Sequence, residues 1–207
     1  MVKLDITFYY YLIEKANVIP LKKKGECCIL PMVRNMKYIL KEIFLVLIMA
    51  AAIYFGTHII FQQHFIEQTS MTPTLAEGQR IFINKLVDKP DRGDIIVFNN
   101  PENPKDTSLI KRVIGLPGEE VAVRSGVVYI NGSPLTETYI IEIPHYTLPK
   151  QIVPNSEYFV LGDNRNASRD SHMGWTVPQD DILGKAWLSI WPLDHLGLIP
   201  DYAYADE

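Results

Sequence analysis

An apolar run in the first third of the chain constrains its architecture most. Residues 43–60 read IFLVLIMAAAIYFGTHII, and Tyr38, Ile39 and Leu40 precede this run. Together they provide roughly 20 residues of low charge, the length that a helix needs to cross a bilayer. The three alanines lie inside the run, whereas a cleavable signal peptide carries its small residues after the apolar region. We therefore expect residues 36–60 to form a transmembrane signal anchor.

Positive charge gathers on the N-terminal side of this anchor. Basic residues cluster before it at Lys22, Lys23, Lys24, Arg34, Lys37 and Lys41, and the first Lys or Arg after it is Arg80. The positive-inside rule places the N-terminus in the cytoplasm and residues 61–207 outside it. The sequence thus predicts a single-pass protein of the cell membrane with an extracytoplasmic domain.

Residues 1–35 show no lasting helical or strand period. Met32 and Met36 are each followed by a short segment with basic residues, which leads to the apolar run. Two interpretations stay open: a cytoplasmic tail, or an extension produced by a start at Met1 upstream of these methionines. Mass spectrometry of the mature N-terminus distinguishes the two.

Composition excludes several function classes. The net charge is −4 and no basic stripe dominates the C-terminal part, which gives no reason to expect a nucleic-acid partner. Two cysteines occur, the adjacent Cys27 and Cys28, and neither a disulfide framework nor a zinc site can be built from them. We expect no metal and no cofactor.

The chain after the anchor is rich in short strand patterns. These are β-branched and aromatic runs bounded by Pro, Gly, Asp and Asn, at residues 80–84, 94–98, 109–114, 119–124, 127–130, 158–161 and 185–191. Ser125-Gly126 and Asn131-Gly132 are turn signals. We expect a mostly β, antiparallel domain over 61–207, with a loop or weakly structured insertion at 136–155 and a short helix around 178–183.

Ser70 is the candidate nucleophile. It lies in Gln68-Thr69-Ser70-Met71-Thr72-Pro73, shortly after the anchor, so its hydroxyl group is expected close to the membrane surface. A serine hydroxyl is a weak nucleophile and needs a neighbouring base. A triad with a histidine stays open, because sequence spacing does not exclude His64, His145, His172 or His195.

Lys111 is the other candidate base. A lysine becomes basic enough at neutral pH when burial disfavours its ammonium form. On a strand, Lys111 shares one face with Leu109 and Val113, while Ile110 and Arg112 take the other. The polar loop 162–171, GDNRNASRDS, follows a strand and suits side-chain-to-backbone turns that orient such groups.

Taken together, these motifs resemble those of type I signal peptidases of the short, single-anchor bacterial kind. The resemblance covers Met36 to Leu198 and rests on four motifs in order: residues 70–75 (SMTPTL), 92–98 (RGDIIVF), 111–119 (KRVIGLPGE) and 162–171. It implies a β-rich signal-peptidase-like catalytic domain and a membrane-anchored serine endopeptidase. Such an enzyme cleaves N-terminal signal peptides from exported preproteins after small residues, at A-x-A-like sites.

The resemblance also implies roles for individual residues. Ser70 attacks and Lys111 takes its proton; Ser168 orients the lysine and Asp170 supports the loop behind it. The N–H of Ser70 supplies part of an oxyanion hole. Substrate binds as an added strand, with Ile66 and Met71 lining small pockets or the membrane-facing surface. The implied partners are preprotein signal peptides and the lipid bilayer, with the secretion translocon nearby.

Two departures from the family pattern bear on efficiency. Gln68 stands where the family has Gly or Ser, so it either donates to the oxyanion through its amide or narrows the cleft. His172 stands where the family has Arg, which makes a salt bridge to Asp170 weaker or pH-dependent. The alternative function is a catalytically silent, membrane-tethered homologue that binds secreted chains. A self-cleaving repressor with a Ser/Lys pair is disfavoured by the anchor and by the absence of a DNA-binding segment.

Overall fold

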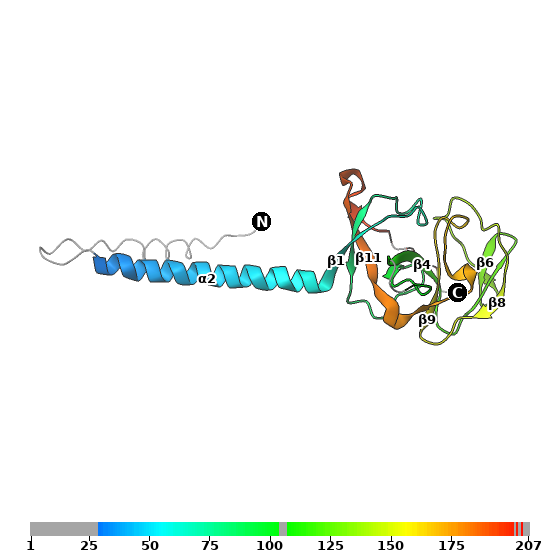
Figure 1. Cartoon of the computed structure of the whole chain (residues 1–207), viewed down its shortest axis with the longest axis horizontal. Coiled ribbons are helices and arrows are strands. Elements are labelled where there is room, and N and C mark those ends of the chain that lie inside the picture. Colours follow the sequence, from blue (N-terminus) through cyan, green and yellow to red (C-terminus); the bar gives the residue numbers. More distant parts are fainter. Residues whose placement is uncertain (1–28, 104–106, 201, 203, 205–207) are drawn as a thin grey trace, which may run out of the picture. The chain divides into compact units, whose positions relative to one another are not determined.

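One long helix opens the described part of the chain. The computed structural model describes residues 29–103, 107–200, 202 and 204, so residues 1–28 of the expected tail at 1–35 lie outside the described part. Helix α2 spans Ile29–Ile60 (Figure 1). Within it, the 23 residues Met36–His58 are long and apolar enough to cross a membrane. This helix fits a membrane-anchored protein.

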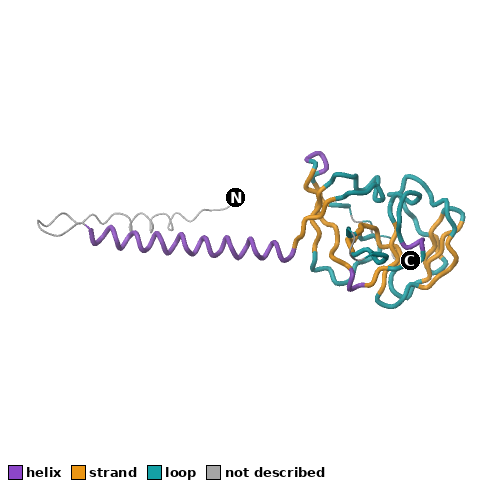
Figure 2. Tube along the Cα trace, viewed as in Figure 1, coloured by secondary structure: helices purple, strands orange, loops and turns teal. Residues whose placement is uncertain are grey.

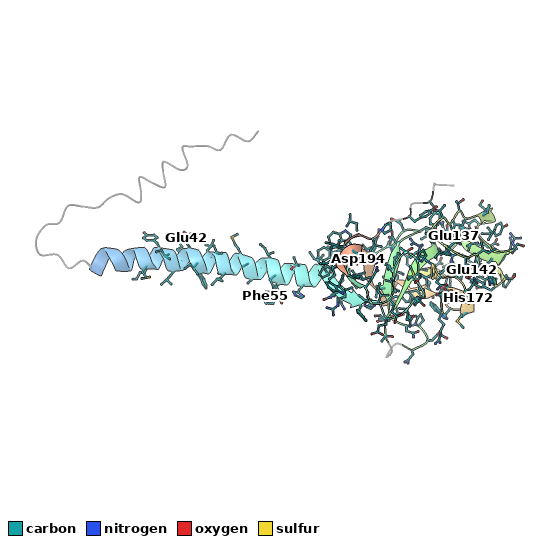
Figure 3. All side chains as sticks on the ribbon, turned by 90° about the horizontal axis from the view of Figure 1, so that it is seen from above. Glu42, Phe55, Glu137, Glu142, His172 and Asp194 are labelled. Atoms are coloured by element: carbon teal, nitrogen blue, oxygen red, sulfur yellow. The ribbon has the colours of Figure 1, made fainter. Side chains whose placement is uncertain are left out.

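Helix α2 begins earlier than expected, at Ile29. Pro31 falls in its first turn, where a residue without a backbone N–H is tolerated. The helix is apolar on all sides: Phe44 and Leu47 are 64% and 61% exposed, and Phe55 projects outward in Figure 3. A helix with this pattern needs an apolar surrounding, and a bilayer supplies one.

The larger of two antiparallel sheets follows the helix (Figure 2). Its spatial order is β1-β2-β11-β3-β4-β9-β10, with β12 paired to β11. The strands are β1 (Phe61–Phe65), β2 (Arg80–Asn84), β3 (Ile95–Phe98), β4 (Leu109–Gly115), β9 (Glu157–Leu161), β10 (Val177–Pro178), β11 (Ile182–Trp191) and β12 (Gly197–Leu198). Strand β4 lies between β3 and β9, so all seven of its residues are buried.

The smaller sheet has four strands in the order β7-β6-β5-β8. They are β5 (Glu120–Arg124), β6 (Val127–Ile130), β7 (Ser133–Pro134) and β8 (Leu148–Ile152). The predicted Ser125-Gly126 turn is confirmed: both residues have positive φ, 50° and 77°, as a two-residue hairpin turn requires. The prediction of a mostly antiparallel β domain behind one apolar helix is thereby confirmed.

Three buried clusters form the core. The first joins the segment after β1 to β2, β3 and β11, and the second lies between the two sheets. The third packs on the other face of β3 and β4. The expected alternation along β4 holds, since Leu109 and Val113 belong to the third cluster and Ile110 to the first. Strand β4 therefore carries side chains into two core layers.

Two predictions about local structure are wrong. Residues 136–155, expected as a loop, contain strand β8, which pairs with β5; its Pro149 is tolerated because β8 is an edge strand. Residues 178–183, expected as a short helix, hold only a three-residue 3-10 turn at Gln179–Asp181 before β11 begins. Strand β1 was not predicted from the sequence, because Gln62 and Gln63 interrupt the apolar alternation.

Candidate active site

Ser70 lies in a compact turn between β1 and β2. The backbone N–H of Thr72 donates to the carbonyl of Thr69 at 3.1 Å, and that of Leu75 donates to the carbonyl of Met71 at 3.0 Å. Met71 and Leu75 are buried in the first core cluster, which anchors the turn. Ser70 itself is only 3% exposed. The hydroxyl group of Ser70 is therefore held in a largely water-free position.

Lys111 lies at the middle of strand β4, opposite Ile96 of β3. Its side chain is 1% exposed. Its Nζ atom donates to Ser70 Oγ at 2.7 Å and to the carbonyl oxygen of Ile110 at 2.9 Å. The structure thus brings together the two residues predicted as nucleophile and base, which are 41 positions apart in the sequence.

The electrostatic surroundings of Lys111 favour its neutral form. Burial lowers the pKa of Lys111 from its ordinary value to about 8, and the nearby negative charges of Asp170 and Asp163 partly oppose this effect. An amine with this pKa is partly unprotonated at neutral pH, whereas an ordinary lysine is almost wholly charged. Lys111 can therefore accept a proton from the hydroxyl group beside it.

The polar loop after β9 closes on the Ser70 turn. The N–H of Asn164 donates to the carbonyl of Ser70 at 3.0 Å, and its side-chain amide donates to Thr69 at 3.3 Å. Gly162 makes this approach possible: a Cβ atom at this position would lie 2.3 Å from Ser168 Oγ and 2.5 Å from the Ser70 carbonyl oxygen. The loop predicted to orient catalytic groups thus contacts the nucleophile segment directly.

Asp170 and Ser168 have different surroundings in this loop. Asp170 is fully buried; its carboxylate accepts from the N–H of Gly162 at 2.9 Å and meets the His172 ring at 2.6 Å. The Oγ atom of Ser168 is buried and has no hydrogen-bond partner among the described groups. The hydrogen bond expected between Ser168 and Lys111 is therefore not formed, because Nζ is directed at Ser70 and the Ile110 carbonyl.

A buried ion pair that sequence reasoning missed lies on the other side of β4. Arg112 donates to Asp163 through Nε at 2.8 Å and Nη2 at 2.7 Å, and to the carbonyl of Gly93 at 2.7 Å. Thr74 Oγ1 donates to the same carboxylate at 2.5 Å. The ring of Tyr139 packs on the guanidinium group at 4.1 Å. Arg112 and Asp163 stood in the motifs of the resemblance, but nothing in either motif indicated that they pair.

A second buried ion pair extends this layer. Arg165 donates to both carboxylate oxygens of Glu137, at 2.7 and 2.5 Å, and through Nε to the carbonyl of Gly162 at 3.0 Å. The hydroxyl groups of Tyr139 and Tyr204 lie 2.5 Å apart beside it. Glu137 and Tyr139 come from residues 136–155, the segment expected to be a loop. The prolines of this segment led to that expectation, and its sequence contained no signal for these buried contacts.

Comparison with known proteins agrees with this geometry. The sequence profile of the family described as "Signal peptidase, peptidase S26" matches residues 36–191. The chain belongs to this family. It is therefore a serine endopeptidase.

Named relatives are similar over most of the chain. A probable signal peptidase I-2 of Synechocystis is 42% identical over 70% of this chain and 69% of its own length. Signal peptidase I U of Bacillus subtilis is 35% identical over 87% of this chain and 97% of its own length. A crystal structure of a signal peptidase I from Enterococcus faecalis is 37% identical, covers 47% of this chain and 96% of that chain, and superposes with a TM-score of 0.43.

A pocket of about 200 Å³ lies next to the two predicted catalytic residues of this signal peptidase chain. It is lined by residues 64–68, which run from the end of β1 toward Ser70, and by residues 107–110, which lead into Lys111. Gln68 is exposed and Ile66 is buried, and both line it. The two lining segments stop two residues before Ser70 and one residue before Lys111.

Other predicted residues lie elsewhere. Met71 has no exposed surface and packs in the core, so it supports the turn from within and adds no wall to this pocket. Among the described contacts, three of the candidate histidines pair with carboxylates: His145 with Glu142, His195 with Asp194 and His172 with Asp170. The fourth, His64, lines the pocket, and the described side-chain hydrogen bond of Ser70 is the one with Lys111. Within the described residues, no group of three or more His, Cys, Asp and Glu side chains could hold a metal ion.

Proposed function

We propose that the chain cleaves N-terminal signal peptides from exported preproteins, with Ser70 as nucleophile and Lys111 as general base. The observation that carries this proposal is the 2.7 Å contact between Lys111 Nζ and Ser70 Oγ in a buried site. Membership of the signal peptidase family supports the reaction class. The low pKa of Lys111, about 8, supports the division of roles.

In the proposed mechanism the dyad moves one proton in each direction. Neutral Lys111 accepts the Ser70 hydroxyl proton while Oγ bonds to the scissile carbonyl carbon. As the C–N bond breaks, the Lys111 ammonium returns that proton to the leaving amine, which leaves an acyl-enzyme. Lys111 then takes a proton from water as the water oxygen attacks the ester. The acid product departs, and the proton returns to Ser70 Oγ.

The negative charge that develops on the carbonyl oxygen needs donors in fixed positions. We assign the backbone N–H of Ser70 as one donor, because the turn that holds it is anchored in the core through Met71 and Leu75. Gln68 is the second candidate, since its exposed side chain borders the pocket. An amide that reaches the oxyanion speeds the reaction, whereas one that fills the cleft restricts the substrates.

Ser168 and Asp170 are proposed to position the base. The Oγ atom of Ser168 is buried without a hydrogen-bond partner among the described groups, and it lies beside Gly162. We propose that this hydroxyl group binds the Lys111 amine while Ser70 is acylated and no longer available to it. Asp170 keeps the loop in place through the N–H of Gly162.

The pocket beside Ser70 supports a preference for small side chains. A space of about 200 Å³ shared by several substrate residues leaves little room for large ones next to the scissile bond. Ile66 supplies an apolar wall. We propose that the substrate enters as an extended strand between residues 64–68 and 107–110 and presents an A-x-A-like site to Ser70.

An apolar surface supports contact with lipid. Large side chains from β1, β11, β12 and the 3-10 helix η3 (Leu193–His195) are exposed: Phe65, Trp187, Trp191, Leu193, Leu196 and Leu198. Trp187 stacks on Phe61 of β1. Aromatic and leucine side chains in such a patch suit the interface of a bilayer. We propose that this surface lies on the membrane, outside the cytoplasm and near the secretion translocon.

The competing function is a silent homologue that binds secreted chains without cutting them. Retention of the hydrogen-bonded Ser70–Lys111 pair disfavours it, because a binding protein gains nothing from a buried lysine that costs stability. The two functions differ in one measurement. A silent homologue binds a preprotein and leaves it intact.

The deciding experiment incubates the detergent-solubilised chain with a preprotein and follows release of the mature form. Ser70→Ala and Lys111→Ala should each abolish cleavage. Matched controls, Ser133→Ala on edge strand β7 and Lys150→Ala on the exposed face of β8, should cleave normally. Equal cleavage by wild type and both dyad variants would sink the assignment, and an intact preprotein bound by wild type would favour the silent homologue.

A further inference from the structure

His172 joins the buried site to solvent. Its Nδ1 atom lies 2.6 Å from Asp170 Oδ1, and its ring stacks on Tyr146 with 4.2 Å between the ring centres (Figure 3 labels His172). The His172 side chain is 21% exposed, whereas that of Asp170 is not exposed at all. The pair thus connects a titratable ring that water can reach to a carboxylate that it cannot.

Asp170 in turn acts on the catalytic pair. Its second oxygen accepts from the N–H of Gly162, the residue that packs against the Ser70 carbonyl. Its negative charge raises the pKa of Lys111 and opposes the larger, lowering effect of burial. A positive charge placed beside Asp170 offsets that opposition. The charge on His172 therefore reaches Lys111 through one intervening residue.

The other charged groups around this pair are held in buried ion pairs. Arg165 is paired with Glu137, and both act on Tyr146, whereas Asp163, which also acts on Lys111, is paired with Arg112. Tyr146 stays neutral, because burial raises the pKa of its hydroxyl group. Histidine is the side chain whose charge changes between about pH 5 and 8. His172 is the histidine in this cluster, and its side chain is partly exposed to water.

We propose that His172 is a positioning residue whose protonation sets, through Asp170, how much of Lys111 is neutral at a given pH. This inference rests on the proposed role of Lys111 as the base. When His172 carries a proton, its charge cancels that of Asp170, so the Lys111 ammonium loses support and releases its proton more readily. When His172 is neutral, Asp170 stabilises the ammonium. Because of this linkage, the chain keeps more activity below pH 7 than it would without the charge on His172.

The test compares kcat/KM from about pH 5.5 to 9.5 for wild type, His172→Gln and His172→Arg. Glutamine keeps a hydrogen-bond donor without a charge, and arginine keeps the charge at every pH. Near pH 6, wild type should match His172→Arg and exceed His172→Gln by about three- to tenfold, the order of magnitude for one added charge acting through Asp170. Above about pH 9 the three should converge. His145→Gln, at an exposed histidine bonded to Glu142, should follow wild type throughout.

Two results would overturn the proposal. One is a ratio of wild type to His172→Gln that stays constant with pH, which indicates a purely structural role. The other is a wild-type profile that follows His172→Gln at every pH, which indicates that the charge of the His172 ring does not affect kcat/KM in this pH range. Circular dichroism of each variant at every pH used separates a loss of folding from the expected convergence at high pH.

A second measurement needs no catalysis. Linkage between two binding equilibria is reciprocal, so Lys111 must affect the protonation of His172. The histidine rings are titrated by NMR in the full chain in detergent, and Ser70→Ala is compared with Ser70→Ala/Lys111→Met. Once the Lys111 cation is removed, the His172 ring should titrate at higher pH. An unchanged titration refutes the linkage. If the His172 titration shifts but the wild-type chain never cleaves a preprotein, the linkage holds and only the proposed function is refuted.

Discussion

Arg112 and Asp163 form a two-point ion pair on the strand that carries the candidate base. The two bonds measure 2.8 and 2.7 Å, and each residue is 1% exposed. Asp163 also accepts from Thr74, four residues beyond Ser70. The pair therefore connects β4, the loop after β9 and the nucleophile turn. It holds in one arrangement the three segments from which the site is built.

Asp163→Asn should destabilise the chain strongly. The substitution keeps the shape of the side chain but leaves the buried Arg112 charge uncompensated, a situation that costs about 3–5 kcal/mol. Urea unfolding in detergent of constant composition measures the loss. The exposed pair Arg169–Glu102 is the control, and Arg169→Met should cost less than about 1 kcal/mol. Equal losses of unfolding free energy at the two sites would mean that burial does not determine how much each ion pair stabilises the chain.

The candidate catalytic residues were easier to find in the sequence than the residues that surround them. Ser70, Lys111 and the loop 162–171 were each identifiable from local motifs, and the structure brings them into contact. Alternation along a strand placed Lys111 between apolar neighbours, but it could not show that β4 is covered on both faces. That burial depends on the core clusters on the two faces, whose side chains come from distant parts of the chain.

The contacts that sequence reasoning missed are all long-range. Glu137 and Tyr139 lie in a Pro-containing stretch without periodicity, and their burial depends on Arg165, more than 25 positions away. Met71 was expected at a pocket wall because it is apolar and follows Ser70. The direction of its side chain depends on the turn, which places it in the core. Periodicity and motifs describe single segments, whereas these contacts depend on how segments distant in the sequence pack against one another.

Gly162→Ala should reduce the turnover rate while leaving the fold largely intact. The added methyl group would lie 2.3 Å from Ser168 Oγ and 2.5 Å from the Ser70 carbonyl oxygen, so either the loop or the nucleophile turn must move. A displacement of about 1 Å at a catalytic group costs roughly a hundredfold in rate. Steady-state cleavage of a preprotein measures kcat.

A glycine in open space provides the comparison for this variant. A Cβ atom at Gly197 of β12 meets nothing within 4 Å. Gly197→Ala should therefore cleave at the wild-type rate. If Gly162→Ala also kept full activity, the close approach of the loop to Ser70 would have no catalytic importance.

Cleavage should depend on pH through the state of Lys111. The pKa of Lys111 is lowered to about 8 by burial, and only the neutral amine accepts the Ser70 proton. We expect kcat/KM to rise with pH and to level off above about pH 8, with activity at pH 6 falling to very roughly a hundredth of the plateau, or less steeply where His172 is protonated. A flat profile between pH 6 and 9 would count against a lysine base.

Lys111→Met should stabilise the chain while abolishing cleavage. The pKa of Lys111 is about 8 in the folded chain against 10.5 for an ordinary lysine, so below pH 8 folding buries an ammonium group that the unfolded chain keeps in water. This penalty is about 3 kcal/mol below pH 8 and disappears as pH rises toward 10.5, because the unfolded chain then loses its proton as well. Methionine fills a similar volume without the charge. Urea unfolding at pH 7 and pH 10.5 should therefore show a gain for the variant at the lower pH that shrinks at the higher one. A gain of the same size at both pH values would show that packing, and not the buried charge, sets the difference.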